Sequence, residues 1–356
     1  GMKKVLQTSK PIIDVYNGYA SIQSIVLNIK EGEKWVIQNY LNYITYYENN
    51  YDTVFMDYTN LGEICFSSTN SFQPQHLVTV PWKTLIISRE LLEENIISFI
   101  KKCINKGYYI FVYLNYKYLL NEKMDFIHDI FIYGYDDEKK EIYMKGYNKQ
   151  NYGEEVYKFE QVEKAFEGIR KLENVDFFSN FDVDSISLVK NDEKFYFEFS
   201  VDYFVKDLEY YLNKKKYILN YKPTVLKNRN CNTSSVVFGN ESIEVLKKYI
   251  ENKNVNKEKI DIRQFYFLKN NKEGFNSKWI FLLKNNYLDY ENLLLDWKIV
   301  ENLAEVLLFY AMKYNVLLEK SYGNQDSIIK IMLKKLEEIK NIEKNIIEKI
   351  IVKLKK

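Results

Sequence analysis

Few side chains in this chain are of the kinds that carry out catalysis. It has two histidines, His76 and His128, and three cysteines, Cys65, Cys103 and Cys231. The cysteines lie far apart, so they predict neither a disulfide framework nor a CxxC metal site, and they favour a reducing compartment. No bound metal and no cofactor are expected from this pattern.

His128 is the histidine whose surroundings are most regular. It opens the segment HDIFIYGYD, and a charged turn, DEKK, joins that segment to EIYMKGYN. This alternation predicts two strands, 128–136 and 141–148, that form a hairpin. A lone histidine at the start of a strand has a structural role in most proteins, so a catalytic reading of His128 depends on the wider pattern.

A helix is expected at 18–29. Its apolar residues recur at spacings of three and four after the polar turn 14–17, as in an amphipathic helix. A second such helix is predicted over 89–106, ended by Gly107, and a strand over 108–116. A third helix is expected at 157–171. Helix followed by pairing strands indicates an antiparallel α+β layer.

The helix start DVYNGYAS and the downstream pattern of histidine, strand, G-Y-D, turn and strand resemble the peptidase C39-like group. More narrowly, they resemble the N-terminal domain of the butirosin biosynthesis protein H family. The resemblance covers residues 10–170. It implies a papain-like fold in which a cysteine begins the helix, a histidine opens the strand and an acid near the end of the next strand orients the histidine. A thiolate at a helix N-terminus beside an imidazole is an activated nucleophile.

Carried onto this sequence, the family pattern is only partly retained. His128 matches the family histidine and is the expected general base. The nucleophile position is Gly18, and the acid position falls on Gly146, so both are substituted. The flanks of the nucleophile match at Asn17, Tyr19, Ala20 and Ser21, and the G-Y-D matches at Gly134, Tyr135 and Asp136. Asn17, Tyr19 and Ser21 are expected to line the cleft.

No other side chain replaces the missing groups in the sequence. Cys103 lies in the apolar helix 89–106 and is expected to be a small buried hydrophobe. Cys231 lies in the polar segment NRNCNTSS and outside the family pattern. Ser21 is expected to satisfy backbone groups or to line the pocket. Asp129 follows His128 on a strand and is expected to point to the opposite face, and Asp136 is expected in the turn.

The second half of the chain is expected to be mainly helical. A boundary is predicted near 172–185, followed by a hairpin, SISLVK–NDEK–FYFEFS, and by a helix capped by Ser200. Further helices are predicted at 242–253, 259–270, 275–285, 290–314 and 326–354. The fold prediction is therefore α+β, with a papain-like domain at 1–175, in which a helix packs on an antiparallel sheet, and a mainly helical accessory domain at 176–356 that carries a small β-hairpin.

Composition excludes several classes of partner. The formal net charge is +2, which gives no strong field for nucleic acid. No apolar run approaches the length of a membrane span, and the N-terminus does not have the pattern of a signal peptide, so a cytoplasmic protein is expected. The richness in Lys, Asn, Ile and Tyr is typical of an AT-rich bacterial genome.

Three functions remain open at this point. The first is a pseudoenzyme that binds a ligand or partner in a natural-product-type pathway, since Gly18 cannot attack a carbonyl. The second is an active acyltransferase or amidase that uses His128 as a general base without a covalent cysteine intermediate. The resemblance implies an acyl carrier protein or a small amine as partner. The third is a structural protein that associates with a second copy through its C-terminal helices.

Overall fold

The computed structural model describes residues 1–48, 50–59, 80–148, 151–170, 183–215 and 235–356. These residues form two compact units. The first holds the described parts of Gly1–Val36 and Glu63–Glu198, and the second holds those of Ile37–Gly62 and Phe199–Lys356. This division differs from the predicted one at residue 175, because the sheet continues beyond that point and because Ile37–Gly62 belongs with the C-terminal helices.

The first unit is an antiparallel sheet between helices, with strand order β4-β9-β5-β6-β7-β8 and with β1 paired to β6. Its strands are β1 (Lys3–Val5), β4 (Trp82–Ser88), β5 (Tyr109–Asn115), β6 (Ile127–Asp136), β7 (Glu141–Asn148), β8 (Asn151–Lys158) and β9 (Ser185–Asn191). Its helices are α1 (Asn17–Val26), α2 (Lys30–Gln38, which ends in the second unit), the 3-10 turn η3 (Arg89–Leu91), α4 (Ile96–Asn105), α5 (Tyr116–Leu120) and α6 (Phe159–Arg170).

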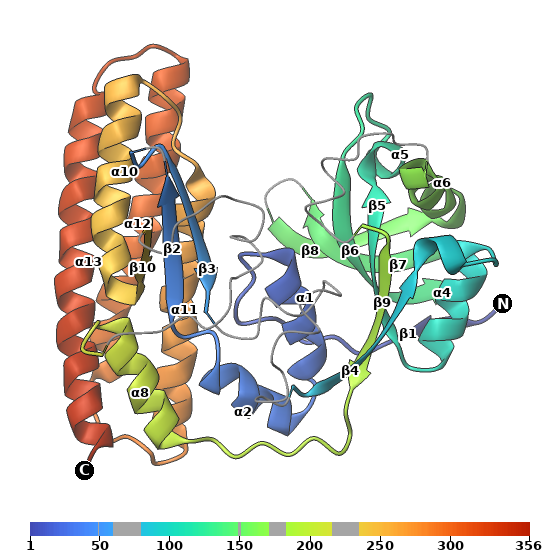
Figure 1. Ribbon diagram of the computed structural model, residues 1–356, viewed down its shortest axis with the longest axis horizontal. Coiled ribbons are helices and arrows are strands. Elements are labelled where there is room, and N and C mark those ends of the chain that lie inside the picture. Colours follow the sequence, from blue (N-terminus) through green and yellow to red (C-terminus); the bar gives the residue numbers. More distant parts are fainter. Residues whose placement is uncertain (49, 60–79, 149–150, 171–182, 216–234) are drawn as a thin grey trace. The chain divides into compact units, whose positions relative to one another are not determined.

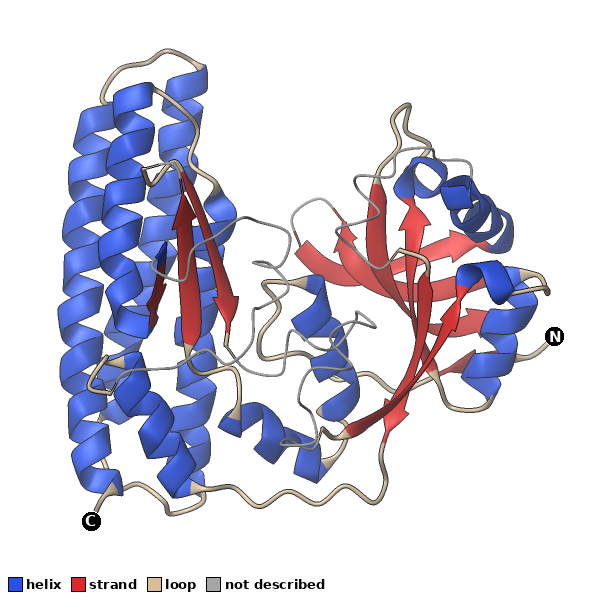
Figure 2. Ribbon diagram, in the orientation of Figure 1, coloured by secondary structure: helices blue, strands red, loops and turns tan. Residues whose placement is uncertain are grey.

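The helices cover both faces of this sheet. Alternate residues of β5, among them Ile110, Val112 and Leu114, pack with α4 and α6 in one apolar core. The helix α1 lies against β6, β7 and β9 on the other face, as Figure 2 shows. The predicted arrangement of a helix on an antiparallel sheet is therefore confirmed at the level of an α+β unit.

The helix predicted at 89–106 starts later than expected. Asn95 caps α4, because its side chain accepts a hydrogen bond from the backbone NH of Ile97 at 2.8 Å. Before it, Arg89 turns inward, and its guanidinium donates to the carbonyl oxygens of Phe166 and Tyr113 at 2.9 and 2.6 Å. The buried arginine therefore holds η3 out of the helix.

The second unit is largely helical and includes a small sheet of order β10-β2-β3. The sheet consists of β2 (Tyr43–Glu48), β3 (Thr53–Tyr58) and β10 (Val236–Phe238), and the helices are α8 (Val201–Tyr211), the 3-10 turn η5 (Gly239–Glu241), α10 (Ser242–Asn256), α11 (Ile262–Lys284), α12 (Leu293–Glu319) and α13 (Gln325–Leu354). Figure 1 shows the long helices α10 to α13 side by side. The predicted helices 259–270 and 275–285 are one continuous helix, α11. Ser200 caps α8 as predicted, accepting from the backbone NH of Tyr203.

The prediction of a hairpin at the start of the C-terminal domain is wrong. Its first half is β9, which pairs with β4 and β5 in the sheet of the first unit. Its second half, around Phe195–Phe199, is not a strand. Both halves alternate in polarity as strands do. However, β9 pairs with β4 on one edge and β5 on the other, so neither edge is left for the second half of the predicted hairpin.

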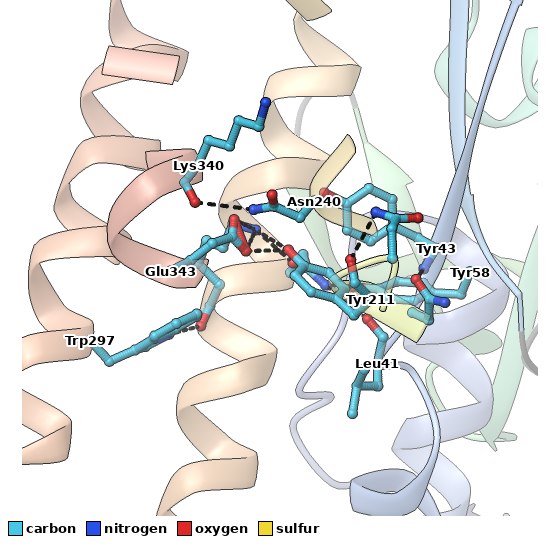
Figure 3. Close-up of polar contacts among 12 residues, drawn as sticks. Leu41, Tyr43, Tyr58, Tyr211, Asn240, Trp297, Lys340 and Glu343 are labelled. Atoms are coloured by element: carbon cyan, nitrogen blue, oxygen red, sulfur yellow. Dashed lines mark hydrogen bonds and ion pairs between the residues drawn. The ribbon is translucent and has the colours of Figure 1, made fainter. Parts of the chain in front are cut away.

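A polar cluster lies inside the helical unit (Figure 3). Lys272 on α11 donates to the Tyr211 hydroxyl at 2.8 Å and to the Asn271 side chain at 3.0 Å. The Tyr211 hydroxyl also donates to Glu343 on α13. Trp297 on α12 donates to the carbonyl oxygen of Lys272 at 2.8 Å, so the cluster ties three of the long helices together.

No helix of the described part of the chain is both long enough and apolar enough to span a bilayer.

Candidate functional site

His128 is the second residue of β6, at an end where the sheet is incomplete. Its backbone lies opposite Leu114 of β5, whereas the pairing of β6 with β7 begins only at Phe131. The imidazole is packed by aromatic rings, with centroid distances of 6.1 Å to Tyr116 and 5.6 Å to Phe126. Its side chain is 30% exposed, so it remains accessible to a ligand.

Asp129 contacts His128 directly, and the prediction that it points away is wrong. The imidazole Nδ1 lies 2.9 Å from the Asp129 carboxylate and 2.9 Å from the Asp129 carbonyl oxygen. Strand alternation sets the directions of the two Cβ atoms. It does not fix the reach of side chains at an open strand end, where the ring of His128 lies along its own backbone.

This pair determines the charge of the imidazole. Burial alone would lower the pKa of His128, but the Asp129 carboxylate overrides it and raises the pKa to about 9. Burial opposes ionisation of Asp129 as well, yet the imidazole holds the pKa of that carboxyl below its ordinary value. His128 is therefore an imidazolium at neutral pH and cannot accept a proton there, which bears on its predicted role as a general base.

The start of α1 lies next to this pair. Asn17, the first residue of the helix, is buried, and its amide donates to the Asp129 carbonyl oxygen at 2.8 Å. Gly18 follows it directly in helical conformation. This hydrogen bond joins the chain neighbour of the predicted nucleophile position to the chain neighbour of the predicted histidine, although the two positions are 110 residues apart in the sequence. Gly18 has no side chain to react.

Two other predicted site residues lie deeper in α1. Ser21 is fully buried, and its hydroxyl lies 3.0 Å from the Tyr152 hydroxyl on β8 and 3.4 Å from the Asn17 side chain. Tyr19 is 3% exposed and packs on Tyr16 with ring centroids 5.6 Å apart. Ser21 extends the polar network from Asn17 to β8, whereas Tyr19 contributes to the core.

A carboxylate occupies the space above Gly146, the predicted acid position. A Cβ at Gly146 would lie 3.1 Å from Glu155 Oε2 and 3.1 Å from the Tyr116 hydroxyl. Glu155 comes from β8, where it lies opposite Met144 of β7. It accepts hydrogen bonds from the hydroxyls of Tyr116 at 3.0 Å and Tyr157 at 2.8 Å.

Glu155 belongs to the electrostatics of the site. Burial raises its pKa, while the two tyrosines and His128 act in the opposite direction. Glu155 in turn contributes to the raised pKa of His128. Sequence reasoning missed this residue because β8 was not predicted. The sequence pattern that indicates β8 is the alternation in EEVYK. In the structure Glu155 and Tyr157 are buried, and Glu154, Val156 and Lys158 are exposed.

The remaining candidates do not add to the site. Cys103 is buried, as predicted, and burial raises the pKa of its thiol to about 11, which makes it unreactive. His76, Cys65 and Cys231 lie outside the described residues. Asp136 was expected in the turn but is the last residue of β6, and it accepts from the backbone NH groups of residues 138 and 139 in the turn that follows. Within the described ranges, no three His, Cys, Asp or Glu side chains are grouped to bind a metal.

Neither a protein-family model nor a curated protein sequence matches this chain.

Proposed function

We propose that the first unit is a papain-like, butirosin-H-like acyltransferase domain that has lost its nucleophile and binds a ligand without a covalent step. The observation that carries this proposal is the 2.8 Å hydrogen bond from Asn17 to the backbone of Asp129. It joins the first turn of a helix to a histidine-bearing strand, as an activated thiol would require, at a point where Gly18 supplies no thiol.

The charge of His128 suggests what such a site would bind. An imidazolium donates from both nitrogens, and the hydrogen bonds of His128 to the described residues use Nδ1. Nε2–H is the donor that we assign to a ligand. A charge-assisted donor among aromatic rings suits the carbonyl or carboxylate oxygen of an acyl group. An acyl group on a carrier protein, or the small amine that would receive it, fits a place in a bacterial natural-product-type pathway.

Restoring the nucleophile tests the architecture. Gly18 has helical backbone geometry, which cysteine adopts without strain, so Gly18→Cys should fold. We expect the introduced thiol to have a pKa below the ordinary value of about 8.5, because a helix N-terminus and an imidazolium both favour a thiolate. Alkylation by iodoacetamide as a function of pH, measured relative to the parent protein, gives this pKa.

The control places a thiol elsewhere in the same sheet. Val156 lies on the face of β8 opposite Glu155 and is 44% exposed. Val156→Cys should titrate near the ordinary value. Adding His128→Gln should raise the thiol pKa of the Gly18→Cys protein and leave that of the Val156→Cys protein unchanged. Equal titration of the two thiols, with no response to His128→Gln, would refute the proposed site.

Binding without turnover is tested with S-acetyl-N-acetylcysteamine, a simple acyl thioester. We expect it to shift the NMR signal of the His128 ring while the thioester stays intact, and we expect His128→Gln to abolish binding. Thioester cleavage by the unmodified protein that disappears in His128→Ala would contradict the pseudoenzyme.

That cleavage would favour the second candidate, an acyltransferase or amidase that uses His128 as a general base. His128 must be neutral to act as a base. The rate of thioester aminolysis should therefore rise with pH through about 9, the pKa of His128. A rate that is flat between pH 7 and pH 10 in thioester aminolysis would exclude this mechanism.

A further inference from the structure

The helix α12 carries two apolar seams rather than one. The first is buried in the helical unit and consists of Leu293, Trp297, Val300, Ala304, Leu307, Ala311 and Tyr314. These residues alternate spacings of four and three, the heptad pattern by which one helix packs against others. This seam accounts for the packing of α12 against α11 and α13.

The second seam repeats the first with a shift of two residues, which is a rotation of about 200° around the helix. Its members are Leu295, Ile299, Asn302, Val306, Phe309, Lys313 and Val316. The apolar ones are exposed, with Leu295 at 70%, Phe309 at 61% and Ile299 at 51%. The seam runs along roughly 33 Å of helix, about three heptads, which is long enough for a coiled-coil pairing.

No such seam faces outward on α13, the last of the C-terminal helices that the sequence suggested for association. Its stripe, including Met332, Leu336, Ile339 and Ile350, is buried within the unit. The exposed heptad pattern on α12 is thus an apolar surface that the helical unit itself does not bury. Large exposed apolar surfaces on a soluble protein mark interaction sites, and five of the seven seam positions are apolar.

We propose that a second copy of this chain covers this seam, with the two α12 helices antiparallel across a two-fold axis. The axis passes between Val306 and Phe309, so that Val306 packs on the partner subunit's Phe309. The same register places Ile299 against the partner subunit's Val316. Each pair occurs twice, as a closed dimer requires.

The polar positions of the seam support this register. Asn302 and Lys313 are the two polar members of the seam, and the register places Asn302 opposite the partner subunit's Lys313. Polar residues therefore meet each other and not an apolar side chain, which is how buried polar positions fix register in coiled coils. A parallel pairing would instead place Lys313 against the partner subunit's Lys313.

Charges beside the seam match in the same way. Lys298 and Glu319 lie on one flank, one at each end, and the antiparallel register brings Lys298 next to the partner subunit's Glu319. Both are largely exposed, at 62% and 68%, and within the chain they contact Glu301 at 3.6 Å and Lys259 at 3.4 Å. Such surface contacts are weak and can exchange for contacts to a partner.

Sedimentation equilibrium of the full chain tests the dimer. At roughly 100 μM, a dimer with a micromolar dissociation constant would be almost fully formed. We expect Phe309→Lys to weaken it at least about 100-fold, because the change buries a charge twice. Val255→Lys is the control, since Val255 is 79% exposed on α10 and lies outside the seam. Circular dichroism checks that both variants remain folded.

A charge exchange tests the register without touching the apolar residues. Lys298→Glu and Glu319→Lys should each weaken the dimer several-fold through like charges, and the double variant should recover the affinity of the parent. A monomer at this concentration would overturn the proposal, as would a dimer that Phe309→Lys and Val255→Lys affect equally. Failure of the double variant to recover affinity would overturn the antiparallel register.

Discussion

Lys272 and Glu343 form an ion pair inside the helical unit, with Nζ 3.0 Å from one carboxylate oxygen and 3.1 Å from the other. Both side chains are fully buried. Burial lowers the pKa of Lys272, and the carboxylate of Glu343 acts against that shift. The pair joins α11 to α13, so each charge depends on the other to remain inside the protein (Figure 3).

Removing one charge of this pair should be severely destabilising. We expect Lys272→Met to lower the free energy of unfolding by about 3–5 kcal/mol, because it leaves the Glu343 carboxylate buried without a cation. Lys269→Met on the same helix is the control, since Lys269 pairs with Glu273 at the surface and such pairs contribute less than about 1 kcal/mol. Urea denaturation measures both. Equal losses would refute this account, and adding Glu343→Met to Lys272→Met should recover part of the loss.

The His128–Asp129 pair should make stability depend on pH. The pKa of His128 rises on folding from an ordinary 6.5 to about 9, so its contribution is complete below pH 6.5 and is lost as the pH rises through 9. We expect His128→Gln to cost about 1–2 kcal/mol at pH 6, after solvent screening of a partly exposed ring, and much less at pH 10. Denaturant unfolding at the two pH values measures this, and a loss that does not change with pH would contradict it.

The two carboxylates near His128 should differ in their effect on its pKa. Asp129→Asn should lower that pKa strongly, because Asp129 is the dominant favourable charge, and Glu155→Gln should lower it only slightly. NMR titration of the imidazole signals measures both, and His128→Gln identifies the signal between the two histidines. Glu138→Gln, in the turn at the other end of β6, is the control and should not change it. A larger effect of Glu155→Gln would show that Glu155, and not Asp129, is the dominant charge beside His128.

Gly239 should tolerate no side chain. Its φ is +53°, and a Cβ there would lie 2.4 Å from the carbonyl oxygen of Tyr211, at the end of α8. We expect Gly239→Ala to cost about 3 kcal/mol or more, combining backbone strain with a clash that only a backbone shift can relieve. Gly323 has a φ of +44° but open space around a Cβ, so Gly323→Ala should cost only about 1 kcal/mol. Thermal unfolding compares them, and similar losses would show that the clash is relieved at no cost.

Much of the local structure follows from residue patterns that are visible in the sequence. Periodicity located α4, β5, the β6–β7 hairpin and α13, because in each of them polar and apolar residues repeat at the spacing of the element. Ser200 was correctly assigned as a cap for the same reason, since the signal lies within a few residues of its effect. The identity of Gly18 also required no structure, because a residue without a side chain cannot be a nucleophile wherever it lies.

Features that depend on residues far apart in the chain could not be predicted in this way. The strand β9 pairs with β4 and β5, and Ile37–Gly62 belongs with the helical unit. Both relationships involve residues far apart in the chain. In the site, the contact of Asp129 with His128 and the position of Glu155 over Gly146 were not predicted. Alternation gives the side of a strand on which a side chain lies, but the electrostatics of a site depend on which charges neighbouring strands bring within a few ångströms, and only the folded chain sets those distances.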